Sequence, residues 1–148
     1  MLIVLVGLSL VLGALLTVQA GANAHLRLFL GSPLSAAVVN FVVGLVAIVG
    51  VGIAARVPLP ALAAASRAPW WSWTGGLIGA AYVASAVVLA PRLGASLFFA
   101  ALVAGQLMGA VLVDHYGWLG FAQQRITLTK LVGLALLVAG VLLVRRDN

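Results

Sequence analysis

The sequence LIVLVGLSLVLGALLTVQAGANA, residues 2–24, contains no charged side chain. Its length matches the roughly 20 apolar residues that an α-helix needs to cross the hydrocarbon core of a bilayer. No basic residue precedes the run, and the run is longer than the core of a signal peptide. We therefore expect it to stay in the protein as a transmembrane helix.

The rest of the chain has the same character. Of 148 residues, 65% are hydrophobic and only 7% are charged, which is too few to cover a water-soluble domain. The basic residues stand singly or in pairs between apolar runs, as headgroup anchors do, so the net charge of +6 does not indicate nucleic-acid binding. The lipid bilayer is the expected solvent.

The sequence lacks the residue patterns of an enzyme. There is no cysteine, no paired carboxylate motif, no phosphate-binding loop and no set of Ser, His and Asp within reach of one site. Two histidines at 25 and 115, with Asp114 alone beside one of them, do not make a metal site. We predict a protein that is not an enzyme and needs no cofactor and no metal.

Four further apolar runs follow, separated by helix-end signals. Ser32 and Pro33 open the second run with a capping residue and a proline at the first helical position. Residues 91–94 (PRLG) predict a tight turn, and residues 60–68 predict a short interfacial segment. We expect an all-α integral membrane protein in which residues 1–148 form a single membrane domain. Its five transmembrane helices are expected at about 2–24, 33–55, 70–90, 95–113 and 127–144.

The basic residues are shared equally between the two sides that five spans define. Four of them, Arg56, Arg67, Arg125 and Lys130, fall on the side of the N-terminus, and the other four are Arg27, Arg92, Arg145 and Arg146. Basic residues in short loops set orientation, so a balanced count favours insertion in both orientations or a partner that fixes one. An antiparallel homodimer would complete a cavity that five helices cannot enclose, since many transporters are built from inverted repeats.

Small residues recur at intervals of four in three of the runs, at Gly13/Thr17/Gly21, Gly75/Gly79 and Gly105/Gly109. Such faces let helices approach closely in lipid. We expect them to serve mainly packing within one subunit, with dimer contacts as the alternative.

Polar and aromatic side chains inside the spans are the best pointers to function, because polar groups cost free energy in lipid unless they find a partner or water. The alternative is that the amides bond between helices and only stabilise them. Tryptophans at a helix mouth are also typical of an aromatic belt at the interface. The predicted cavity-lining, substrate-binding residues are Gln19, Asn23, Asn40, Trp73, Tyr82, Ser85, Phe99 and Gln106.

No Asp, Glu, Lys, Arg or His occupies the middle third of any expected span. Proton-coupled transporters place such a group there. The nearest candidates for coupling are Asp114 and His115, at the end of the fourth helix. The alternative for Asp114 is that it caps the helix or pairs with a nearby arginine.

Several stretches carry a family likeness, and they occur in order along nearly the whole chain. They are QAGANAHLR at 19–27, GSP at 31–33, WSWTGGLIGAAY at 71–82, APRLGA at 90–95, GQ at 105–106 and DHYG at 114–117. Together they resemble the short, YdcZ-like branch of the drug/metabolite transporter (DMT) superfamily. The resemblance implies a five-helix inner-membrane protein similar to one half of the ten-helix members, whose halves are inverted repeats. It also allows a paired homologue as partner in place of a second copy.

These patterns predict a small transporter of the inner (plasma) membrane, an exporter for a small organic metabolite or a cationic compound. The substrate would cross through a dimer-interface cavity by alternating access. Short relatives of the small multidrug-resistance type carry an acidic residue in the first helix, and this chain has none, so their proton exchange is not implied. One alternative is a dual-topology small-ion channel, because residues 40–44 after the Ser-Pro start are similar to the second helix of small fluoride channels. The other is a membrane scaffold subunit that transports nothing.

Overall fold

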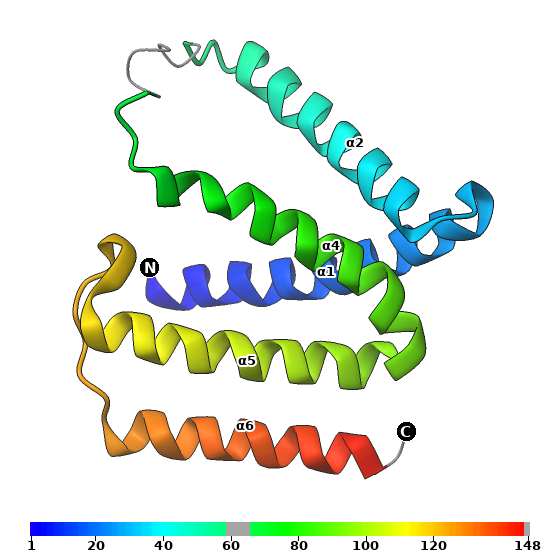
Figure 1. Ribbon diagram of the computed structural model, residues 1–148. Coiled ribbons are helices and arrows are strands. Elements are labelled where there is room, and N and C mark those ends of the chain that lie inside the picture. Colours follow the sequence, from blue (N-terminus) through cyan, green and yellow to red (C-terminus); the bar gives the residue numbers. More distant parts are fainter. Residues whose placement is uncertain (59–65, 147–148) are drawn as a thin grey trace. The chain divides into compact units, whose positions relative to one another are not determined.

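The computed structural model describes residues 1–58 and 66–146, and over these ranges the chain is helical with no strand (Figure 1). The membrane-length helices are α1 (Leu2–Leu30), α2 (Pro33–Ala54), η1 with α4 (Trp70–Trp73 and Thr74–Leu93), α5 (Ala95–Tyr116) and α6 (Leu128–Arg146). A 3-10 turn, η2 (Trp118–Gly120), follows α5. The described residues confirm the all-α fold with five helices that are long and apolar enough to span a membrane. The interfacial segment expected at 60–68 falls mostly outside the described residues.

The first helix is longer than expected. α1 continues to Leu30, and Gly31 ends it in the left-handed conformation, φ 70°, with its N–H donating to the Arg27 carbonyl at 2.9 Å. Glycine adopts this conformation without a Cβ clash, which makes it the usual helix terminator. The predicted end at residue 24 was wrong because arginine is a good helix former and does not stop a helix. The predicted start of α2 is confirmed, since Ser32 Oγ accepts a hydrogen bond from the Ser35 N–H at 3.4 Å and Pro33 follows the cap.

The turn predicted at residues 91–94 is also wrong. α4 runs through Pro91 to Leu93, and Gly94 alone, at φ 76°, separates it from α5. A proline this close to a helix end removes one backbone hydrogen bond, the one its N–H would have donated to the carbonyl four residues earlier. α5 likewise continues beyond the expected residue 113, to Tyr116, and is capped by Gly117 at φ 65°.

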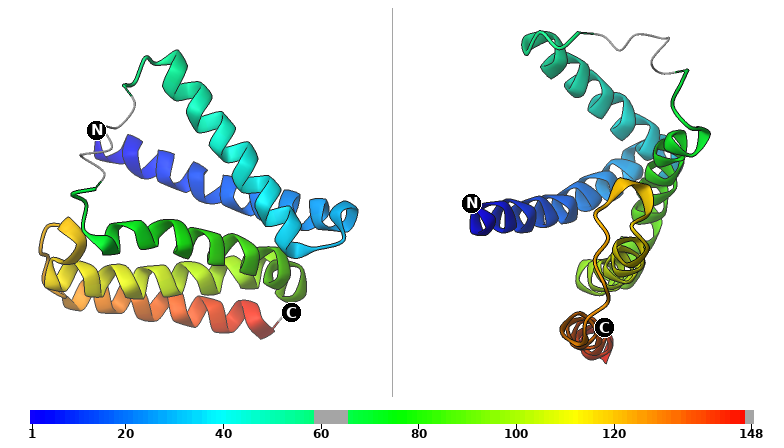
Figure 2. Two further views of the ribbon diagram at one scale, coloured as in Figure 1. Left: turned by 45° about the horizontal axis from the view of Figure 1, so that its top comes forward. Right: turned by 90° about the vertical axis from the view of Figure 1, so that its left-hand side faces the viewer.

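The chain divides into two compact units, residues 1–89 and 90–148. In the first unit, α1 and α2 contact each other near the turn at Gly31 and diverge along their length (Figures 1 and 2). The buried side chains of this unit are almost all small: Ala20, Asn23, Ala36, Ala37, Val83, Ala86 and Val87. Small side chains let helices approach closely in lipid, where apolar side chains gain little by leaving the acyl chains.

In the second unit, α5 and α6 lie side by side and run in opposite directions (Figure 1). The start of α6 is set by Thr127, whose Oγ accepts a hydrogen bond from the Lys130 N–H at 3.3 Å, as an N-cap side chain does. Between the helices, the Gln124 N–H donates to the Asp114 carbonyl at 2.7 Å. This hydrogen bond therefore holds the loop between α5 and α6 against the last turn of α5.

The glycine faces do not mediate close packing inside either unit. A Cβ atom built on any glycine of the three faces would meet no atom within 4 Å. The expectation that these faces pack within the subunit therefore finds no support among the described residues of either unit.

Candidate functional site

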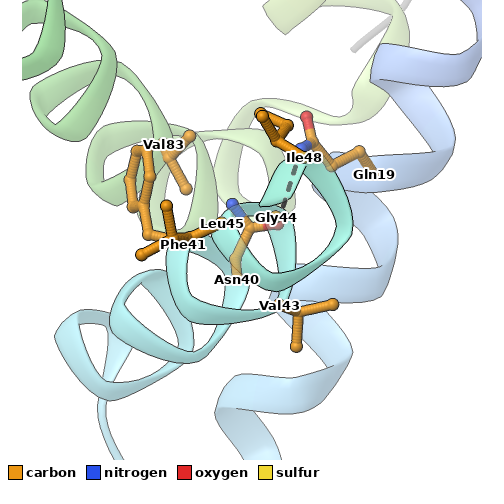
Figure 3. A pocket seen from close by; sticks show the side chains of 8 residues that line it. All are labelled: Gln19, Asn40, Phe41, Val43, Gly44, Leu45, Ile48 and Val83. Carbon is orange, nitrogen blue, oxygen red and sulfur yellow. Dashed lines mark hydrogen bonds between the residues drawn. The ribbon is translucent and has the colours of Figure 1, made fainter. Parts of the chain in front are cut away.

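The first unit contains a groove of about 480 Å³ lined by three helices (Figure 3). Two carboxamides provide its polar groups: Gln19 of α1 donates through Nε2 to Asn40 Oδ1 of α2 at 3.4 Å. The other lining residues are apolar or glycine: Phe41, Val43, Gly44, Leu45 and Ile48 of α2, and Val83 of α4. An amide pair in an otherwise apolar, membrane-spanning setting can orient one polar group of a ligand.

Gln19 also borders a second hollow. This one, of about 350 Å³, lies along α1 and is otherwise lined by Leu12, Leu15 and Leu16. The same carboxamide thus lines both hollows, and in the second it is the sole polar side chain among the described lining residues.

Asn23 and Arg27 continue the polar face of α1 at intervals of four residues beyond Gln19. Asn23 is buried, with 7% of its surface exposed. Arg27 Nη1 donates to the Val87 carbonyl of α4 at 3.3 Å. Pro91 has no N–H to give to this carbonyl, so the guanidinium supplies the hydrogen bond that the helix itself lacks.

The remaining predicted site residues of the first unit lie apart from the groove. Tyr82 is half-buried beside the groove residue Val83, and Ser85 and Trp73 are exposed. None of the three is among the described residues that line the groove, and neither is Asn23. Their roles stay predictions.

In the second unit, Phe99 and Gln106 lie on α5. Phe99 is half-buried and packs edge-on against Phe98, with ring centroids 5.1 Å apart. Gln106 is exposed near the middle of the helix and has no hydrogen-bond partner within the described part of its unit. A carboxamide at this depth requires a partner, because lipid offers none.

Asp114 and His115 lie in the last turn of α5, among polar groups of the following loop. Asp114 Oδ2 is 3.9 Å from Lys130 Nζ, and both side chains are 30% exposed. Asp114 thus pairs with a lysine rather than the expected arginine. His115 accepts a hydrogen bond at its carbonyl from Gln123 Nε2 at 3.0 Å, whereas its ring Nδ1 is buried without a partner among the described residues.

A comparison with known families decides the identity of the chain. The family described as "Putative inner membrane exporter, YdcZ" matches residues 4–143. The chain belongs to this family. Searches of the curated proteins and of the solved structures find no match.

Membership of the YdcZ family confirms the resemblance seen in the sequence. With the membrane-length helices of the described residues, it makes the chain a multi-pass protein of the inner membrane, with the lipid bilayer as its surroundings. A family of inner-membrane exporters points to transport rather than catalysis.

The sequence alone missed three features of the candidate site in this YdcZ-family chain. Phe41 and Val83 line the groove, but apolar side chains that line a groove look the same in sequence as those that face lipid. The bond from Arg27 to Val87 was also missed. A signal for it existed, because Pro91 inside a helix leaves the carbonyl at position 87 free for another donor.

Proposed function

We propose that this chain is an exporter that moves a small organic molecule by alternating access. Two copies in opposite orientations, or one copy and a paired homologue, enclose the pathway. The observation that carries the proposal is the open groove with its pair of bonded amides, Gln19 and Asn40, in a chain of an exporter family.

Three features support a second copy. Gln106 is exposed at membrane depth without a hydrogen-bond partner in its unit. The face of Gly105 and Gly109 has no neighbour where a Cβ would lie. Basic residues are balanced between the two sides, which favours dual insertion of the single membrane domain.

Within the pathway, Gln19 and Asn40 are the proposed polar contacts for the substrate. Gln106 would complete the cavity from the partner copy. The other assigned cavity residues, which lie outside the groove in one copy, are Asn23, Trp73, Tyr82, Ser85 and Phe99.

Asp114 and His115 are the proposed coupling residues. The pairing of Asp114 with Lys130 favours a structural role for the carboxylate. The unpartnered Nδ1 of His115 makes the imidazole the stronger candidate for a proton carrier. A pH gradient should drive export in the wild type and fail to do so in His115→Asn, whereas loss of the effect in Asp114→Asn alone would reverse this ranking.

The test of transport is efflux from proteoliposomes loaded with ethidium, an organic cation, or with radiolabelled uridine, a neutral metabolite. We expect efflux of one probe to saturate with concentration and to fall in Asn40→Ala and Gln106→Ala. Ser9→Ala is the matched control, because Ser9 bonds only to the Leu5 carbonyl of its own helix.

Other outcomes would contradict the proposal. Saturable efflux that both substitutions leave unchanged would refute the site. Fast ion flux without saturation would indicate a channel, and no flux with stable co-purification of another protein would indicate a scaffold subunit.

The oppositely oriented copy is tested by labelling a single cysteine from outside the cell. The chain has no cysteine of its own, so Ala122→Cys in the loop after α5 gives an unambiguous signal. We expect only part of the population to be labelled. Labelling that shows every copy in one orientation, with no inverted companion protein, would refute the enclosed pathway.

A further inference from the structure

We infer that the groove of the first unit takes an uncharged amphiphile, with a head that both donates and accepts hydrogen bonds at Gln19 and Asn40 and an apolar body. The inference rests on the proposed function and names the substrate class of the same site. Its starting point is the position of Gln19, which lines both the groove and the aliphatic hollow along α1.

The hydrogen-bonding inventory of the two amides selects the head. Each carboxamide has one oxygen acceptor and two N–H donors. Their mutual bond uses one N–H of Gln19 and one lone pair of Asn40. An acceptor on Gln19 and donors on Asn40 are left without another partner among the described residues. A carboxamide, lactam or imide presents the matching donor and acceptor together.

The absence of charge selects against ions. No acidic or basic side chain is among the described residues that line the groove or the hollow. Arg27, the nearest cation along α1, is eight residues from Gln19, about 12 Å along the helix axis, and its guanidinium is bonded to Val87. An anion would therefore enter an apolar site without a counter-charge, which is strongly unfavourable.

An organic cation fares little better. Its favourable contacts in the described lining are neutral: the amide oxygens of Gln19 and Asn40 and the aromatic ring of Phe41. Neutral groups without a carboxylate offset only part of the cost of removing an ion from water. A neutral head group loses much less hydration free energy on binding than an ion does. The observed lining therefore favours a neutral head group.

The aliphatic hollow selects the body. Leu12, Leu15 and Leu16 present only hydrocarbon next to the Gln19 amide. A chain or ring attached to the head would lie there and gain the favourable burial of apolar surface. The combined size of the two hollows suits a metabolite-sized molecule.

The test uses three probes with one skeleton and three charge states: 4-phenylbutyramide, 4-phenylbutyrate and 4-phenylbutylammonium. Thermal unfolding of the full chain is measured in lipid nanodiscs, because a ligand that binds the folded state raises Tm. We expect the amide to raise Tm in a saturable way, and the two ions to need at least a tenfold higher concentration for the same shift.

The variants locate the head. Gln19→Leu and Asn40→Leu should each abolish most of the amide-dependent shift, and Ser9→Ala on the same helix should preserve it. Because a substitution can lower stability by itself, the Tm of each variant with probe is compared with its own Tm without probe. A leucine variant that does not fold is replaced by Gln19→Glu. This substitution introduces a charge into the groove, so the preference for the amide probe should be lost. Two results would overturn the inference. One is a Tm shift in the wild type that is as large or larger with either ion than with the amide. The other is an amide-dependent Tm shift that persists in both Gln19→Leu and Asn40→Leu.

The outcomes separate the inference from the transport proposal. Saturable efflux without an amide-dependent shift overturns the inference and leaves the exporter standing. An amide-dependent shift without saturable efflux of any probe supports the site and overturns the exporter.

Discussion

The two units of the chain use polar side chains in different places. In residues 1–89, the bond between Gln19 and Asn40 joins two helices inside the apolar span, and Arg27 bonds to a carbonyl of a third. In residues 90–148, the polar ties gather at the loop end of the hairpin, around Asp114 and Lys130. A polar group inside a span needs a partner because lipid offers none, whereas a partly exposed ion pair at a helix end contributes little to stability. The interhelical amide bond thus belongs to the first unit, whereas the polar contacts of the second unit lie at its loop end.

The largest expected effect in this comparison concerns Arg27. Arg27→Leu should lower the free energy of unfolding in micelles by about 2 kcal/mol, because a charged donor is lost and a carbonyl is left unpaired. Arg92→Leu, which removes a charge at an exposed position, should stay within about 0.5 kcal/mol.

The link to Pro91 gives a sharper form of the same test. Pro91→Ala restores an N–H to the helix, which can then bond to the Val87 carbonyl without Arg27. The cost of Arg27→Leu should therefore be clearly smaller in the Pro91→Ala background. Equal costs in the two backgrounds would show that the guanidinium does not replace the missing backbone donor.

The next effect concerns the amide pair. Gln19→Leu or Asn40→Leu alone should cost about 1 kcal/mol, in the range found for hydrogen bonds between membrane helices. The double variant should be nearly as stable as the wild type, because no unpaired amide remains. Efflux should nevertheless fall in all three variants. A double variant with normal efflux would show that the pair serves stability only.

The glycine face of α5 should respond in the opposite direction. Gly109→Ala introduces a better helix former where a Cβ meets nothing, so the isolated chain should gain about 0.5–1 kcal/mol. Crosslinking between copies should decrease at the same time, because the Cβ keeps the second copy further away. Unchanged crosslinking would exclude this face as the contact.

The smallest effect is expected at the loop end of the second unit. Asp114→Asn and Lys130→Gln each break an ion pair whose partners are 30% exposed. Each should change the free energy of unfolding by no more than about 0.5 kcal/mol. A cost as large as that of Arg27→Leu would remove the distinction between the two units.

The sequence predicted the number and type of the helices, because apolar length alone decides whether a segment spans a bilayer. The positions of the helix ends were predicted less accurately. Ends were expected at about residues 24, 90 and 113, whereas these helices end at Gly31, Gly94 and Gly117, where the backbone has positive φ. Charged side chains and a late proline fit inside a helix when another group meets their hydrogen-bonding needs.

The candidate site was predictable only in its polar part. Gln19 and Asn40 stood out as amides in apolar runs, and the structure brings them into contact. Their binding role stays a prediction. The apolar lining and the bond from Arg27 depend on how helices meet, which neither composition nor periodicity specifies.

The bond between Arg27 and the Val87 carbonyl also constrains how this sequence can evolve. Loss of the proline first should be tolerated, because any other residue at position 91 can donate its N–H to the Val87 carbonyl. Position 27 is then no longer under selection to keep the arginine. Losing the arginine first leaves the carbonyl of the buried Val87 without a donor and should be selected against. Positions 27 and 91 should therefore covary among family members, with a basic residue retained wherever the proline persists.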